Sequence, residues 1–407
     1  MRHRTLTLII VLELYALFLT VLRALQGIRT DEAKYLLDIA YPHPPVLRTF
    51  MGLTAHLPGH EFVWRFIFAS VLVQMVWFFV DIGGVLTPAR RRALLLAWLF
   101  STAVLLQAGS VMMMIPVACF CVVLLWYILR QESITANQTG LIGIGWTIAL
   151  FTSYQSVLLF PLVVSAMLRS RQPITRTIIL VVVPILLLIL YTFTNPLILA
   201  SMLDIAGQGS SAASPVADRA ISTALVLLLG GSAVLVLTGL IGIVTSRRLD
   251  LVLTFALLLG YTAISSQQYY AILFTPLLVA GTYLLLCRRK LRPSFLALAH
   301  VVTAFFAAWM FWYGGDRPLE ARATIRALTE IRSEGAILID GPFGHEWQYE
   351  AGDQEIIRFT ETLSLQAEER ADAFVCTAHD CSEHVDTDIW VRLQSTPIPT
   401  WVRRTPL

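Results

Sequence analysis

Charged residues are scarce in this chain: Asp, Glu, Lys and Arg make up 14% of its 407 residues, whereas hydrophobic residues make up 57%. Soluble domains contain about 25% charged residues, so this composition excludes a wholly soluble protein. Apolar runs of roughly 15 to 20 residues recur along most of the sequence, and runs of this length approach the thickness of a bilayer. We therefore predict a polytopic α-helical membrane protein, and we expect no nucleic acid among its partners.

Arginine clusters set the predicted orientation, because Lys and Arg near the ends of spans stay on the cytoplasmic side. If every cluster is cytoplasmic, an even number of spans must separate each cluster from the next. We predict eleven transmembrane helices in the plasma (inner) membrane, with the amino terminus inside and the carboxyl end outside. The segments are 5–25, 62–83, 93–109, 111–129, 139–153, 154–168, 177–196, 220–244, 249–264, 270–287 and 294–313.

Two of these segments need comment. The stretch 139–168 is short for two crossings, so a re-entrant pair that keeps the same parity is the alternative. The first segment is not followed by a small-residue cleavage site, so we expect it to be a retained helix. Glu13 lies within that helix, and we expect it to hydrogen-bond a neighbouring helix because an ionisable group in a span is costly.

The composition changes after Gly314. Residues 314–407 hold 17 acidic and nine basic residues and no apolar run long enough to span a membrane. We predict a small external, periplasmic-side α/β domain here, and a transmembrane domain over 1–313 with an external loop at 26–61. Within the C-terminal domain the pattern predicts helices at 318–333 and 354–370 and strands at 336–339, 373–376 and 389–393.

Cysteine is also scarce, with five residues in the chain. Cys376 and Cys381 both lie in the predicted external domain, where disulfides persist, so a bridge between them is favoured. A zinc site that uses the same stretch together with His379 and His384 is the alternative. That stretch lacks the CxxC and HxxxH spacings typical of zinc sites.

An acid pair, Asp31 and Glu32, lies in the first external loop. Thr30 before it is a predicted helix N-cap, and acids in a first turn suit the positive end of the helix dipole, which would be a purely structural role. A helix over 31–40 would also place Lys34 one turn from Asp31. The second interpretation is a catalytic role, because a carboxylate beside a cation at a membrane surface is an arrangement suited to chemistry.

Other residues of the loop fall on or beside this predicted helix. Tyr35 and Asp38 would share the face of the first acid, and Tyr41-Pro42 would end the helix because proline disfavours helical geometry in the residue before it. After Pro44-Pro45, apolar and polar residues alternate in a way that predicts an interfacial helix over 45–57.

These residues resemble a family. An acid pair in the first external loop, a nearby tyrosine, a Pro-Pro step and an interfacial helix are similar to the membrane-embedded C-type (GT-C) glycosyltransferases, in particular the aminoarabinose transferase and protein O-mannosyltransferase group. The segment from Gln267 to Pro276 is similar to the aromatic-then-proline entry into a late helix of these enzymes. The resemblance covers 1–313. Relatives often have Lys before the Pro-Pro step, where this chain has His43, and the external domain matches no family module.

The resemblance implies transfer of a sugar from a polyprenyl-phosphate donor to an acceptor hydroxyl of a lipid, glycan or protein on the external face. Asp31 would be the general base, and Glu32 would orient the acceptor or help bind a divalent metal ion, which some relatives use and others lack. Residues assigned to the donor phosphate are Lys34, His43, Arg48 and Arg65. Those assigned to the substrate cavity are Tyr35, Asp38, Tyr41, Gln268, Tyr269 and Tyr270.

Structural roles compete with several of these assignments. His43 suits a turn, and Arg48 and Arg65 suit contacts with lipid headgroups at the interface. Tyr269 and Tyr270 suit an interfacial aromatic belt.

Two other functions stay open. A transporter or lipid flippase would have paired halves with similar broken helices, whereas the odd helix count and the polar first loop favour the transferase. A non-catalytic scaffold would use the acidic external domain to bind a partner.

Overall fold

The structure of the protein is a computed structural model, and two compact units are recognised in it from the contacts within the chain. The first comprises Met1–Arg23 with Ala40–Trp312, and the second comprises Ala24–Ile39 with Tyr313–Leu407. The segment that carries Asp31 and Glu32 therefore groups with the C-terminal domain. The described residues are 2–39, 44–130, 134–170, 172–196, 198–199, 216–265, 267–289, 292–312, 317–331, 335–340, 345–359, 370–377, 385–386 and 388–404.

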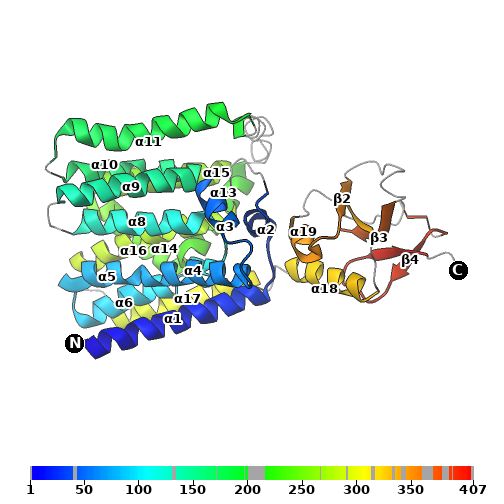
Figure 1. Cartoon of the computed structure of the whole chain (residues 1–407). Coiled ribbons are helices and arrows are strands. Elements are labelled where there is room, and N and C mark those ends of the chain that lie inside the picture. Colours follow the sequence, from blue (N-terminus) through cyan, green and yellow to red (C-terminus); the bar gives the residue numbers. More distant parts are fainter. Residues whose placement is uncertain are drawn as a thin grey trace. The chain divides into compact units, whose positions relative to one another are not determined.

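Apart from an isolated β-bridge between Ile134 and Ser170, the regular elements among the described residues of the first unit are all helices (Figure 1). Its helices are α1 (Arg2–Leu25), α3 (Val46–Gly52), α4 (His60–Gln74), α5 (Val76–Ile82), η1 (Gly83–Val85), α6 (Pro88–Leu99), α7 (Thr102–Gln107), α8 (Met114–Leu129), α9 (Ala136–Thr152), η2 (Tyr154–Leu159), α10 (Phe160–Leu168), α11 (Ile174–Thr194), α13 (Val216–Gly231), α14 (Ala233–Ser246), α15 (Leu249–Ile264), η3 (Gln268–Tyr270), α16 (Ala271–Arg288) and α17 (Pro293–Trp312).

Several of these helices are apolar enough to cross a membrane. Within the described residues, five are long enough as well, and a sixth span results if α13 and α14, which are bent by 95° at their junction, count as one. All eleven predicted segments fall on helices, but five of them lack a helix long enough to span: these are 93–109 on α6 and α7, 139–153 on α9, and the segments on α8, α15 and the η2–α10 pair. Eleven crossings and their sidedness stay predictions.

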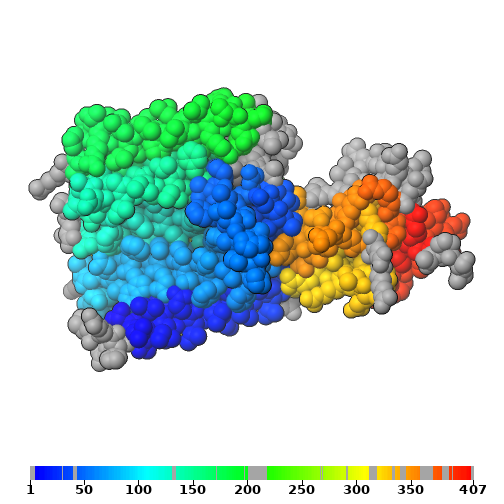
Figure 2. Space-filling view, in the orientation of Figure 1, coloured from blue at the N-terminus to red at the C-terminus, as the bar shows by residue number. Residues whose placement is uncertain are grey.

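Burial separates the inner helices of this unit from the outer ones. Helix α16 is almost wholly buried because it packs against α6, α7, α8, α13, α14 and α15. Helix α11, green in Figures 1 and 2, packs on α9 and α10 and leaves its other side exposed. Phe193 on α11 and Phe306 on α17 are 67% and 62% exposed. So much exposed apolar surface is stable in lipid and prone to aggregate in water.

The tightest helix packing joins α14 to α16 through glycines. A Cβ atom added at Gly242 would lie 1.8 Å from the carbonyl oxygen of Gly281, and one at Gly239 would lie 2.7 Å from the Cα atom of Leu278. Small residues let two backbones approach this closely in membrane proteins, where packing rather than hydrophobicity holds helices together.

Glu13 has partners on a neighbouring helix, as expected. Its carboxylate accepts hydrogen bonds from the Ser70 hydroxyl at 2.8 Å and from the Gln74 amide at 2.7 Å, both on α4. The cost of an acid within an apolar helix is thereby reduced.

Several arginines of the predicted cytoplasmic clusters donate to carbonyls at helix C-termini. Carbonyls in the last turn of a helix mostly lack a partner within that helix, and a cation there also complements the helix dipole. The pairs are Arg90 with Leu286, Arg91 with Gly83 and Gly84, Arg169 with Arg130, Arg248 with Ile128, and Arg288 with Thr245 and Ser246.

The second unit contains a mixed sheet and three described helices. The strand order is β2-β1-β3-β5-β4, with β1 parallel to β2 and β3, and β5 antiparallel to β3 and β4. Helices α18 and α19 share a core with β1 and β3. The elements are α2 (Thr30–Leu36), α18 (Arg317–Glu330), β1 (Ala336–Asp340), α19 (His345–Ala351), β2 (Ile356–Phe359), β3 (Ala371–Cys376), β4 (Trp390–Leu393) and β5 (Thr400–Arg403).

The predicted helix over 354–370 is wrong where the structure describes it. Residues Ile356–Phe359 form strand β2, whose β-branched and aromatic side chains suit a strand that pairs with β1. The prediction also missed α19 and β5. The other helix and the three strands predicted in this domain coincide with α18, β1, β3 and β4, with ends that differ by a few residues.

Candidate functional site

Glu32 of the acid pair is committed to the local structure of α2. Arg29 is the N-cap residue, and its backbone N–H donates to the Glu32 carboxylate at 3.0 Å. The Glu32 residue is fully buried. A carboxylate at the third helical position satisfies a donor that the helix leaves unpaired and lies near the positive end of the dipole. The structural interpretation of a first-turn acid therefore applies to Glu32.

Asp31 differs from its neighbour in exposure and in partner. Its side chain is 34% exposed and accepts a hydrogen bond from the Lys34 ammonium group at 3.1 Å, while the Lys34 side chain is 14% exposed. Tyr35, one turn along the helix, is buried. Asp31 is thus the member of the pair whose carboxylate reaches solvent, and it does so beside a positive charge.

The helix ends earlier than the sequence predicts. We expected it to reach residue 40, but α2 ends at Leu36, and Asp38 has a left-handed conformation with φ of 51°. The Asp38 N–H donates to the Tyr35 carbonyl, and the Ile39 N–H donates to the Lys34 carbonyl at 3.0 Å. This pair of bonds is a Schellman C-cap, which aspartate tolerates because its short side chain permits a positive φ. Asp38 consequently does not share the helical face of Asp31.

Arg65 lies in the first unit and is fully buried. Its Nε donates to the Glu61 carboxylate at 2.7 Å, and one of its terminal nitrogens donates to the Gly109 carbonyl at 2.9 Å. Gly109 has φ of 80°, and a Cβ there would lie 3.2 Å from the Thr20 backbone. Arg65 therefore connects α4 to the tight turn between α7 and α8.

The late tyrosine pair also lies in the first unit. Tyr270 is buried, and its hydroxyl lies 2.9 Å from the Tyr261 hydroxyl, while the Tyr269 and Tyr270 rings meet edge to face. The side-chain amide of Gln155 donates to both the Tyr261 and Tyr270 hydroxyls, at 2.8 and 3.3 Å. Buried hydrogen bonding of this kind differs from an aromatic belt, in which the polar atoms contact the interface.

Sequence reasoning missed Gln155 and Tyr261 as members of this cluster. A signal for the first was present, because an amide inside an apolar segment must find a partner. Nothing in the sequence linked it to two tyrosines more than 100 positions away.

The remaining assigned residues divide as follows. Arg48 lies on α3 in the first unit and is partly exposed. The side chain of Gln268 and the whole of Tyr41 and His43 lie outside the described residues. Among these residues, Asp31 therefore pairs with Lys34, and the Tyr269 ring contacts the Tyr270 ring. Arg65 donates hydrogen bonds to the Glu61 carboxylate and the Gly109 carbonyl.

Within the described part of the chain, no three His, Cys, Asp or Glu side chains lie close enough together to hold a metal ion. Cys376 is in a disulfide, so it has no thiolate to offer zinc. Its predicted partner Cys381 lies outside the described residues, as do His379 and His384.

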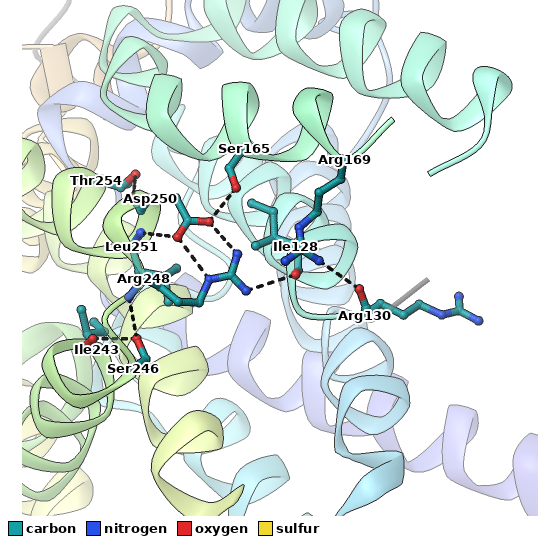
Figure 3. A network of polar contacts seen from close by, with 10 residues as sticks. All are labelled: Ile128, Arg130, Ser165, Arg169, Ile243, Ser246, Arg248, Asp250, Leu251 and Thr254. Carbon is teal, nitrogen blue, oxygen red and sulfur yellow. Dashed lines mark hydrogen bonds and ion pairs between the residues drawn. The ribbon is translucent and has the colours of Figure 1, made fainter. Parts of the chain in front are cut away.

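A second polar cluster lies at the opposite end of α15 from Tyr261 (Figure 3). Asp250 accepts hydrogen bonds from Arg248 and, at 2.7 Å, from the Ser165 hydroxyl on α10, while Arg248 also donates to the Ile128 carbonyl of α8. Partial burial and the nearby Arg248 lower the pKa of Arg169, and Asp250 opposes that change. The cluster connects α8, α10 and α15 by hydrogen bonds, and its charged groups face one another. These features fit a structural role.

Neither a protein-family model nor a curated protein sequence matches this chain.

Proposed function

We propose that this protein is a membrane-embedded glycosyltransferase of the C-type that moves a sugar from a polyprenyl-phosphate donor to an acceptor hydroxyl on the external face. The proposal includes eleven spans, a cytoplasmic amino terminus and an external C-terminal domain. One observation carries it: α2 holds a solvent-reaching carboxylate, Asp31, beside an ammonium group, and a buried neighbouring acid caps the same short helix.

The chemistry of the proposed step uses these two groups. As the acceptor oxygen attacks the anomeric carbon, the Asp31 carboxylate takes the hydroxyl proton. The bond from that carbon to the phosphate oxygen breaks, and its electron pair leaves with the lipid phosphate. Lys34 would stabilise the charge that develops on this phosphate. Glu32 stabilises the N-terminus of α2. This role differs from the acceptor or metal contact that the resemblance implies.

The test compares two aspartates of the second unit. Asp31→Asn removes the base and leaves the side-chain shape unchanged, so turnover of a polyprenyl-phosphate sugar should fall about 10²- to 10⁴-fold. Asp353→Asn is the matched control, because it makes the same chemical change at an exposed aspartate that has no proposed role in the site. Turnover is measured with purified protein in lipid, and lipid-linked sugars are profiled in cells with and without the gene.

The outcomes of this test are distinct. Donor that accumulates with Asp31→Asn but not with Asp353→Asn supports the proposal and identifies the sugar. Equal activity of the two variants would remove Asp31 as the base, and equal donor levels with and without the gene would remove the transferase function.

A transporter or lipid flippase is the second candidate, because one feature favours it. Helices α13 and α14 meet at a 95° bend at Ser232, and broken helices are typical of transporter binding sites. A largely apolar cavity of about 520 Å³ lies beside the bend and is lined by residues that include Leu228, Ala233 and Phe306. The test measures movement of lipid between the two leaflets of proteoliposomes. Movement that is unaffected by Asp31→Asn would favour this candidate over the transferase.

A further inference from the structure

A single arginine of the C-terminal domain connects three segments of the second unit. Arg322 on α18 donates from Nε to the Glu350 carboxylate on α19 at 2.9 Å, and from a terminal nitrogen to the Ala24 carbonyl at 3.4 Å. The Arg322 and Glu350 side chains are 23% and 14% exposed. A charge-assisted bond that is largely shielded from solvent holds geometry better than a surface ion pair.

The third segment begins with Ala24, which lies in the last turn of α1, and leads into the acid-bearing helix. Only a few residues separate Ala24 from the N-cap Arg29, and Ile28 between them is buried. The Gly27 N–H also donates to the Ala24 carbonyl, at 3.3 Å. The Arg322 bond therefore adds a restraint from the C-terminal domain at the point where α1 ends and the chain leads into α2.

Helix α2 itself needs such support. It has seven residues, and isolated helices of that length are unstable in water because nucleation is costly. The packing that stabilises it within the second unit comes from α19, the helix that carries Glu350. The C-terminal domain thus contacts both the entry to α2 and its body.

We infer that Arg322 is a positioning residue for Asp31, and that the C-terminal domain serves to hold the acid-bearing helix in its working orientation. The positioning claim concerns residues 24–39 alone, whereas its effect on catalysis rests on the proposed transferase function.

Hydrogen exchange measured on the full-length protein tests the positioning directly. Arg322→Ala should make the backbone amides of 29–37 exchange about tenfold faster, because a charged hydrogen bond to the preceding segment is lost. Arg326→Ala is the matched control: it is the same residue type one turn along α18, it is exposed, and exchange in 29–37 should be unchanged. Arg322→Lys keeps a donor for Glu350 and should recover part of the protection.

Kinetics then separate positioning from general destabilisation. Arg322→Ala should lower kcat about 10- to 100-fold and leave the KM for the donor within about twofold, because misplacing a base by a fraction of an ångström slows the step without removing donor contacts. Arg322→Lys should restore much of kcat.

Each outcome decides one point. Faster exchange confined to 317–351, with 29–37 still protected, would overturn the inference, as would a raised KM with normal kcat. If Arg322→Ala does not fold, Arg322→Lys and Glu350→Gln give the same comparison with smaller changes. Faster exchange in 29–37 in a protein whose wild type transfers no sugar would keep the positioning role and reject the proposed function.

Discussion

Two adjacent carboxylates in one short helix have different roles because they occupy different helical positions. Glu32 is the third helical residue, where a side chain reaches back to the N-cap N–H, and Asp31 is the second, where it points outward to Lys34. The sequence predicted a helix start here but placed the cap at Thr30, one residue late. Assignments of a helix end commonly differ by a residue or two. Here the position of the N-cap decides which of the two acids is buried.

At the same scale, the buried guanidinium of Arg65 gives a stability prediction. Glu61→Gln removes the charge that faces it, and we expect a loss of about 2 kcal/mol, less than a fully buried pair costs because the Glu61 side chain is 21% exposed. Thermal unfolding in detergent checks this.

Glu355→Gln is the control for that measurement. It breaks the pair with Arg370, in which both side chains are more than half exposed, and should cost less than about 0.5 kcal/mol. A similar loss in both variants would mean that burial adds nothing to the Arg65 pair.

At the scale of elements, hydropathy located every apolar segment of the first unit because helices in lipid must be apolar over most of their length. It did not locate the bend at Ser232, which has φ of 92° and lies 2.8 Å, hydroxyl to ring nitrogen, from His300 on α17. That bend depends on a partner far away in sequence. Strand β2 was mistaken for a helix for the same reason, since its pairing with β1 decides its conformation.

The glycine contact between α14 and α16 gives the element-scale prediction. Gly242→Ala should destabilise the protein by about 3 kcal/mol or more, because the new methyl would lie 1.8 Å from the Gly281 carbonyl oxygen and the two backbones must separate. The measurement is the thermal stability of the variant in detergent.

Gly260→Ala on α15 is the matched control, since no atom outside the neighbouring backbone of α15 lies within 4 Å of its added methyl. Alanine favours a helix over glycine by about 0.5–1 kcal/mol, so this variant should be as stable as the wild type or more so. Equal stability of the two variants would show that α14 and α16 separate at little cost.

For the whole molecule, the sequence predicted a membrane part over 1–313 followed by a small α/β domain, and contacts within the chain group Ala40–Trp312 in one unit and Tyr313–Leu407 in the other. It did not predict that Ala24–Ile39 would group with the distant domain, because only the folded contacts of α19 and Arg322 bring those segments together. For the same reason, the candidate site could be predicted as a set of residue types but not as an arrangement.

The prediction at this scale concerns the side of the membrane that each part of the chain faces. In a Cys287→Ser background, Ser395→Cys should react with a membrane-impermeant maleimide on intact cells, because the turn between β4 and β5 is exposed and predicted to be external. The Val85 side chain is 78% exposed and lies in a predicted cytoplasmic connection, so Val85→Cys should react only after permeabilisation. The reverse pattern would invert the topology.

The arginines bound to helix-end carbonyls have a consequence for how this protein tolerates change. In the proposed topology, the guanidinium groups that would retain their segments in the cytosol during insertion are the same groups that bind carbonyls of neighbouring helices in the folded bundle. If that topology holds, one set of side chains encodes both the orientation of the chain and the stability of the fold. Replacing those arginines to change the orientation would then also weaken the contacts between the helices.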